Sequence, residues 1–134
     1  MRCGNGKRPW PSIVQYMLQK YQDVRILNLD KLTYAGNLEN LASVKDDPRY
    51  TFIHADICDK AAVEKIFAEN AIDYVVNFAA ESHVDRSIRE PEVFVKTNVE
   101  GTVCLLNAAR NAWNLGGDDY KEGCKYLQVS TDEV

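Results

Sequence analysis

Long apolar runs are missing from this sequence of 134 residues, and none approaches the roughly 20 residues that a membrane-spanning helix needs. An excess of basic residues is missing as well, because the formal net charge is −4. That charge argues against a nucleic-acid or anionic-membrane partner. The opening residues Met1 to Gly4 have no apolar stretch of the kind found in secretory signals. We therefore expect no membrane and no nucleic-acid partner, and a cytoplasmic location.

Cysteine motifs are missing too, although cysteine itself is present. Its positions fit neither the spacing of a zinc site nor that of a paired redox motif, so we expect reduced thiols and no metal. What the sequence does have is the balance of a globular protein, with 46% hydrophobic and 27% charged residues. Its length allows one domain with a sizeable core and is too short for two ordinary domains. The four cysteines are Cys3, Cys58, Cys104 and Cys124.

Strand-like and helix-like segments alternate along the chain. Branched and apolar residues predict strands at 24–30, 50–55, 74–78 and 126–130, and the nearly continuous apolar run at 74–78 predicts a strand covered on both faces. Strands separated by helices indicate βαβ units. The expected fold class is therefore α/β, a doubly wound parallel sheet.

Helices are predicted from apolar residues at helical spacing. They are expected at 13–21, at 38–44, after a cap at Asp59, and from the first turn at Pro91 to about Trp113. The polar stretch 114–123 is expected to be a loop. The apolar positions on which the first and last helices rest are Ile13, Met17 and Leu18, and Phe94, Val99, Val103, Leu106 and Ala109.

Polar residues stand where the predicted strands end, which is where open parallel sheets bind ligands. Asp30 closes the first predicted strand, and a carboxylate there is suited to accept the two ribose hydroxyls of NAD and to repel the 2′-phosphate of NADP. Asp56 follows the second strand and could accept from an adenine amino group. Taken singly, each is equally well read as an aspartate that starts a turn.

The third predicted strand is followed by small residues. Ala79 and Ala80 allow a flat ligand to approach the backbone closely, and Ser82 offers a small hydroxyl beside them. His83 is more simply a histidine hydrogen-bonded within its loop, and Asp85 and Arg86 are expected to pair with each other.

The last predicted strand runs into Thr131, Asp132 and Glu133. Adjacent carboxylates can act as an acid and a base if their surroundings differ. Neighbours on a regular strand point to opposite faces, so both could serve one substrate only where the chain leaves the sheet. On these residues alone, a solvated acidic end explains the sequence equally well.

Together these segments resemble the dTDP-glucose 4,6-dehydratases, which belong to the extended short-chain dehydrogenase/reductase superfamily. The resemblance runs in order and spacing from about Val14 to Val134. It implies a Rossmann-like NAD-binding domain and a parent enzyme that is a homodimer. The segments that carry it are Asn28-Leu29-Asp30-Lys31-Leu32-Thr33-Tyr34-Ala35-Gly36-Asn37-Leu38, His54-Ala55-Asp56-Ile57-Cys58-Asp59, 79–87, Thr97-Asn98-Val99-Glu100-Gly101-Thr102 and 130–134.

The resemblance implies an NAD-dependent lyase that converts dTDP-glucose into the 4-keto-6-deoxy sugar nucleotide and water. It places Thr131 at the sugar, Asp132 as the acid for the C6 hydroxyl and Glu133 as the base for the C5 proton. The cofactor residues that it implies are Asp30, Lys31, Leu32 and Thr33 for the adenosine ribose, Asp56 and Ile57 for the adenine, Ala79, Ala80 and Thr97 for the nicotinamide half, and Ser82 near cofactor and sugar.

The sequence departs from the family pattern in residues 1–12. The family begins with a strand and a Gly-rich turn that receives the pyrophosphate, but here Lys7 and Trp10 fall near the positions of its second and third glycines. We therefore expect an atypical segment 1–12 and a partial NAD-binding domain at 13–134 that is without the first strand and the Gly-rich turn. By the same resemblance, the catalytic Tyr-x-x-x-Lys pair and the substrate domain would lie after Val134, so the chain alone is expected to be inactive.

Two alternatives remain open from the sequence. One is another nucleotide-sugar enzyme of the superfamily, such as an epimerase or a decarboxylase, although the Asp132–Glu133 pair suits a dehydration better. The other is a non-catalytic truncated product or a weak nucleotide-binding module.

Overall fold

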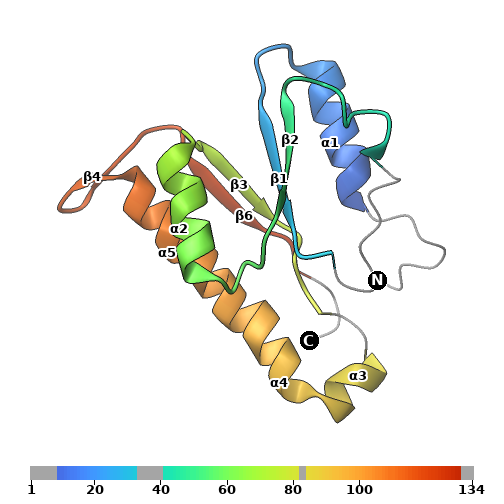
Figure 1. The fold of residues 1–134 in the computed structure, drawn as a ribbon. Helices are drawn as coiled ribbons and strands as arrows, with labels where there is room; N and C mark the ends of the chain where they lie inside the picture. The colour runs from blue at the N-terminus through green and yellow to red at the C-terminus, as the bar shows by residue number, and fades with distance from the viewer. Residues whose placement is uncertain (1–8, 33–40, 82–83, 131–134) are drawn as a thin grey trace. The chain divides into compact units, whose positions relative to one another are not determined.

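A computed structural model describes residues 9–32, 41–81 and 84–130 of the chain (Figure 1). The chain divides into two compact units, the first ending at His54 and the second beginning at Ala55. Within the described ranges, no helix is long and apolar enough to cross a membrane.

The first unit packs helix α1 (Pro9–Lys20) against strands β1 (Ile26–Asp30) and β2 (Tyr50–His54). The strands are parallel, with Ile26 opposite Tyr50 and Asp30 opposite His54. The core consists of Val14, Leu18, Leu41 and Tyr50. Because Val14 and Leu18 are four residues apart, they lie on one face of the helix and cover the sheet together.

The expected helix at 13–21 is confirmed, but its start and its buried face differ from the prediction. It begins at Pro9, inside the segment expected to be atypical, because proline is tolerated in a first turn, where its missing N–H has no helical partner. Ile13, predicted on the buried face, is 40% exposed, and Val14 takes its place. Of the helix expected at 38–44, residues 41–44 are described and form a tight turn rather than an α-helix, with the N–H of Val44 bonded to the carbonyl oxygen of Leu41 at 2.9 Å. Residues 38–40 lie outside the described ranges.

The second unit begins with the turn after β2 and helix α2 (Lys60–Glu69). The expected cap at Asp59 is confirmed, since its carboxylate accepts the N–H of Ala62 at 3.1 Å. Val63 of this helix is 1% exposed and is buried together with Leu105, Ala108 and Ala109 of α5 (Thr102–Trp113). In Figure 1 the two helices lie side by side along the strands of this unit.

Strands β3 (Tyr74–Asn77) and β6 (Lys125–Gln128) form a parallel pair in which Val76 lies opposite Leu127. The strand predicted at 74–78 is present, but the prediction that both its faces are covered is wrong. Tyr74 is 64% exposed and Val76 46% exposed, while Asn77 is buried. Helices α2 and α5 lie on one side of the pair, so alternate residues of β3 point to solvent.

The helix expected from Pro91 to Trp113 is present as α4 (Pro91–Phe94), a π-helical segment η3 (Val95–Gly101) and α5, with the short α3 (Val84–Arg89) before it. Its predicted apolar face is only partly buried. Val99, Val103 and Leu106 are 55%, 50% and 43% exposed, and the buried residues of α5 are Leu105, Ala108 and Ala109. The apolar residues therefore form two faces, one packed on α2 and one open.

The loop expected at 114–123 is instead mostly a small antiparallel hairpin of β4 (Asn114–Gly116) and β5 (Asp119–Tyr120). Gly116 and Gly117 have φ values of 127° and 58°, which only glycine adopts at little cost, so the polar stretch turns back on itself. The side chain of Asn114 accepts the N–H of Gly116 at 3.0 Å and donates to the carbonyl of Gly117 at 2.9 Å.

Two parallel strand pairs joined through helices make an incomplete doubly wound α/β domain, as predicted. In a complete sheet of this class the pairs β1–β2 and β3–β6 are bridged by a further strand. Helix α1 is the first described element, and residues 1–8 lie outside the described ranges, so the predicted lack of a first strand stays a prediction.

Candidate functional site

The residues predicted after β1 form a turn held by its own atoms. Asp30 Oδ1 accepts the N–H of Leu32 at 2.8 Å, and Leu32 has a positive φ of 51°. His54, at the end of β2, lies with Nε2 3.0 Å from the carbonyl oxygen of Lys31. Asp30 thus starts a turn, which is the simpler of the two interpretations of its sequence position. A carboxylate has two oxygens and about four acceptor positions, so this role does not exclude hydroxyl binding.

The turn after β2 repeats the arrangement in the second unit. Asp56 Oδ1 accepts the N–H of Cys58 at 2.9 Å, and the Ile57 side chain between them is only 7% exposed. The thiol of Cys58 donates to the carbonyl oxygen of Lys96 in η3 at 3.3 Å. The Asp56–Ile57 turn is therefore anchored on the helix rather than standing free in solvent.

The loop after β3 is fixed by two asparagines. Asn77 is 3% exposed, accepts the N–H of Ala79 at 3.0 Å through Oδ1, and donates to Gln128 Oε1 at 2.9 Å. Asn98 of η3 accepts the N–H of Glu81 at 2.8 Å and donates to its carbonyl at 3.0 Å. Ala79 and Ala80 lie between these two attachments, so their small side chains are held at the carboxyl end of the strand.

Segment η3 contains Thr97, which is half-buried, and is followed by a threonine that bonds back to it. The hydroxyl of Thr102 donates to the carbonyl oxygen of Asn98 at 2.8 Å, and the N–H of Thr102 bonds instead to Val99. A threonine that bonds back to the carbonyl four residues earlier competes with the regular helical ladder. Such π-helical turns are frequent at functional sites.

The structure describes Asp30, Lys31, Leu32, Asp56, Ile57, Ala79, Ala80 and Thr97 among the predicted site residues. Within the second unit it brings the Asp56–Ile57 turn and the loop after Ala80 onto one helical segment, η3. The predicted residues that lie outside the described ranges are Thr33, Ser82, Thr131, Asp132 and Glu133, as is His83.

Sequence reasoning missed Asn77, Asn98 and Gly101, although each carries a signal. Asn77 is a polar residue at the end of an apolar strand run, and a buried amide must find partners. Gly101 lies within a long helix, where glycine costs about 1 kcal/mol relative to alanine. A glycine at such a position therefore indicates close packing or a functional constraint. Asn98 has the weakest signal, because an exposed helical asparagine is common.

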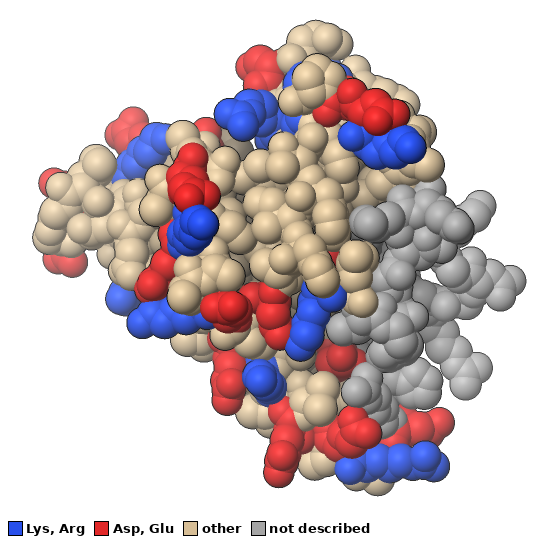
Figure 2. All heavy atoms as spheres, viewed as in Figure 1, with Lys and Arg blue, Asp and Glu red and all other residues tan. Residues whose placement is uncertain are grey.

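Burial shapes the electrostatics around β6. It raises the pKa of the Tyr126 phenol, and hydrogen bonding to Asn77 partly opposes this. The Tyr126 hydroxyl donates to Gln128 Oε1 at 3.2 Å, the same oxygen that receives Asn77. On the face seen in Figure 2, acidic and basic side chains are interspersed. Helix α2 carries two ion pairs, Lys60–Glu64 and Lys65–Glu69, each at 3.7 Å.

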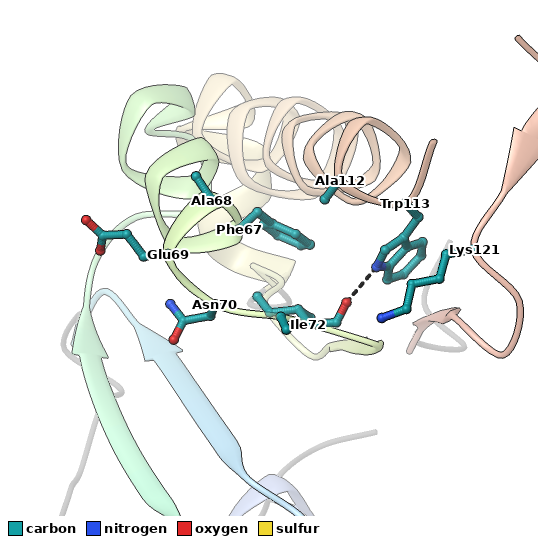
Figure 3. A pocket seen from close by; sticks show the side chains of 9 residues that line it. Phe67, Ala68, Glu69, Asn70, Ile72, Ala112, Trp113 and Lys121 are labelled. Atoms are coloured by element: carbon teal, nitrogen blue, oxygen red, sulfur yellow. Dashed lines mark hydrogen bonds between the residues drawn. The ribbon is translucent and has the colours of Figure 1, made fainter. Parts of the chain in front are cut away.

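A pocket in the second unit lies at the opposite end of β3 (Figure 3). Phe67 of α2 and Trp113 of α5 line it, and Trp113 Nε1 donates to the carbonyl oxygen of Ile72 at 2.6 Å. Because Ile72 precedes β3, the pocket is at the amino end of the strand, away from Ala79 and Ala80.

A Tyr-x-x-x-Lys spacing does occur in α1, at Tyr16 and Lys20. Lys20 Nζ lies 5.3 Å from the ring centroids of both Tyr16 and Tyr21. Helix α1 leads into the amino end of β1, whereas Asp30 is at its carboxyl end. The pair is therefore at the wrong end of the strand to act with Asp30 and is a surface cation–π contact.

Comparison with known proteins decides the family. The profile of the GDP-mannose 4,6 dehydratase family matches residues 12–134. The chain belongs to this family. The match begins in the first turns of α1 and continues through all the strand ends described above.

Members of this dehydratase family resemble the chain in both sequence and structure. The dTDP-glucose 4,6-dehydratase of Shigella flexneri is 51% identical over 123 residues, which is 92% of this chain and 34% of the relative. The crystal structure of dTDP-glucose 4,6-dehydratase from Bacillus anthracis in complex with NAD superposes with a TM-score of 0.73 at 38% identity, covering 92% of this chain and 34% of that one. The chain thus spans about a third of these relatives.

Epimerases of similar fold are more distant. The UDP-glucose 4-epimerase of Thermotoga maritima, solved with UDP-glucose, has a TM-score of 0.68 at 27% identity, covering 81% of this chain and 33% of that one. The Rossmann-like architecture is shared with the dehydratases, and the sequence lies closer to the dehydratases. The resemblance drawn from the sequence is confirmed.

Proposed function

We propose that the chain is the NAD-binding part of an NAD-dependent lyase that converts dTDP-glucose into dTDP-4-keto-6-deoxyglucose and water. The observation that carries the proposal is the 51% identity to a dTDP-glucose 4,6-dehydratase. It is supported by the carboxylate, isoleucine and alanines that follow β1, β2 and β3. The reaction would take place in the cytoplasm, without nucleic-acid or membrane partners.

The residues assigned to the cofactor suit NAD. Asp30 retains acceptor capacity for the ribose hydroxyls, and its negative charge disfavours a 2′-phosphate. Asp56 and Ile57 would hold the adenine, and Lys31, Leu32 and Thr33 the ribose side. The residues assigned to the nicotinamide half, and to the region between cofactor and sugar, are Ala79, Ala80, Ser82 and Thr97.

When bound, NAD would supply the temporary oxidation at C4 that acidifies the C5 proton of the sugar, holding the C4 hydride and returning it to C6 after water has left, while C5 regains a proton. The chain's own residues then act on the sugar. Glu133 removes the C5 proton, Asp132 protonates the departing C6 hydroxyl so that it leaves as water, and Thr131 orients the glucose. The two carboxyl groups need opposite protonation states, which requires different surroundings for each.

Cofactor binding tests the first half of the proposal. We expect isothermal titration calorimetry of the chain to show NAD binding that is at least about tenfold tighter than NADP binding, and Asp30→Ala to remove the difference. Asp23→Ala, at an exposed aspartate before β1, is the matched control. Equal affinity for both cofactors, or no binding, would contradict the assignment.

A turnover assay separates the two classes of function. By the proposal, the chain alone binds NAD and leaves dTDP-glucose unchanged, because the hydride-transfer residues of the superfamily have no counterpart at the strand ends described. Conversion by the chain alone would refute that expectation. A near-ultraviolet circular dichroism spectrum typical of a molten globule, together with no NAD binding, would instead favour the non-catalytic alternative.

The open face of the long helix supports a homodimer of the parent enzyme. Val95, Val99, Val103 and Leu106 are 53%, 55%, 50% and 43% exposed and recur at helical spacing, so they form one apolar stripe. A second copy of the same helix would bury it in a two-fold contact. Light scattering should report a dimer for the unchanged protein and a monomer for Val99→Lys. Val76→Lys, on the exposed face of β3, is the control and should leave the dimer intact.

A further inference from the structure

Segment η3 touches the turn after β2 at one helical position that has no side chain. Gly101 is buried. A Cβ atom placed there would lie 2.5 Å from Ile57 Cδ1, 2.7 Å from Ile57 Cγ1 and 3.2 Å from Cys58 Sγ. Carbon atoms in contact normally stand about 3.5–4.0 Å apart, so even a methyl group would displace the isoleucine.

The backbone of Gly101 does not itself require glycine. Its φ and ψ of −61° and −41° are those of an ordinary right-handed helix, in which alanine would be about 1 kcal/mol more favourable. The absence of a side chain is therefore explained by the close approach of Ile57 and not by conformation.

Two hydrogen bonds link the contact between Gly101 and Ile57 to the residues assigned to the cofactor. Ile57 is 7% exposed, so its side chain has little room to move aside. Asp56, its neighbour, is fixed by the Cys58 N–H at 2.9 Å, and Cys58 is in turn bound to Lys96 of η3 at 3.3 Å. A shift of Ile57 would therefore move the Asp56 carboxylate as well.

We propose that Gly101 is a positioning residue for the adenine end of the NAD site. Because Gly101 has no side chain, Ile57 can pack directly against η3, and this packing determines the position of Asp56. This rests on the proposed function, because Asp56 and Ile57 are the residues assigned to adenine. Gly101 touches no cofactor atom in this proposal and acts only through Ile57.

The test measures NAD affinity of the folded chain by calorimetry, with folding checked by circular dichroism at the same temperature. Gly101→Ala should weaken NAD binding about tenfold, since overpacking displaces the turn. Glu100→Ala, at the exposed neighbouring position of the same helix, should bind NAD within about twofold of the unchanged chain. A purely structural role would lower stability without changing the affinity of the folded fraction.

A compensating variant keeps the test decisive if Gly101→Ala unfolds. In Gly101→Ala with Ile57→Ala, the two atoms that clash are removed, so folding should recover relative to Gly101→Ala alone. Because Ile57 is itself assigned to adenine, the NAD affinity of the double variant is compared with that of Ile57→Ala, and Gly101→Ala should add no further loss in that background. A double variant that stays unfolded or binds NAD more weakly than Ile57→Ala would overturn the proposal, as would unchanged affinity in Gly101→Ala. If the unchanged chain itself binds no NAD, the proposed function fails first and the positioning role with it.

Discussion

The loops after β1 and after β3 carry equivalent parts of the proposed cofactor site, yet they are held in different ways. The loop after β1 is turned by Asp30 bonding to Leu32 two residues later, with His54 of the neighbouring β2 at the carbonyl of Lys31. The loop after β3 begins with a local bond of Asn77 to Ala79 and is then held at Glu81 by Asn98, 17 residues away. The first loop needs only the strand pair β1–β2, whereas the second also depends on the long helix being packed correctly. The comparison predicts that distant substitutions will loosen the loop after β3 and leave the loop after β1 unchanged.

The largest effect is expected from the buried amide at the end of β3. Asn77→Leu would leave the part-buried N–H of Ala79 without its partner and the exposed Gln128 Oε1 with only the Tyr126 hydroxyl. Leaving a polar group of this kind unsatisfied costs about 1–3 kcal/mol, so we expect a loss of about 2 kcal/mol in urea unfolding. Asn107→Leu, on the exposed side of α5, should change stability by less than about 0.5 kcal/mol. Equal effects of the two would show that the network around Asn77 contributes little.

The next effect tests the long-range clamp directly. Asn98→Ala removes both hydrogen bonds to Glu81, and because the site is exposed we expect a loss of about 1 kcal/mol. Hydrogen exchange should accelerate at the Glu81 amide while the Leu32 amide keeps its protection. Asn98→Asp retains the acceptor and loses the donor, so its stability should lie between those of the unchanged chain and Asn98→Ala. Faster exchange at both loops would contradict the comparison.

The same distinction explains what could be predicted from the sequence. The strands and the helix cap at Asp59 follow from local patterns, and the structure confirms them. That ligands bind at the ends of these strands stays a prediction. The exposed faces of β3 and of the long helix could not be predicted, because an apolar run states that residues prefer burial and not whether a partner covers them. The roles of Asn98 and Gly101 depend on contacts with residues 17 and 44 positions away, between Asn98 and Glu81 and between Gly101 and Ile57.

A smaller effect should appear at alkaline pH. Burial raises the pKa of Tyr126 in the folded chain, so the folded state keeps this proton after the unfolded state has lost it. The associated stability is fully present below the unfolded tyrosine pKa of about 10 and is lost as pH rises above it towards the folded value. Comparing unfolding free energies at pH 8 and at about pH 10.5, Tyr126→Phe should fall less than the unchanged chain. Tyr74→Phe, at an exposed tyrosine of β3, controls for the other groups that titrate there.

The smallest effect is expected in the locally held loop. Leu32 has a φ of 51°, a region that costs a residue with a Cβ about 1 kcal/mol and that asparagine tolerates better. Leu32→Asn should therefore stabilise the chain by about 0.5 kcal/mol, and Leu32→Val, whose branched side chain is disfavoured there, should destabilise it by about 1 kcal/mol. Neither should alter exchange at Glu81. If either substitution loosened the loop after β3, the two loops would be coupled, and the local turn at Asp30 would be part of one cooperative site rather than an independent element.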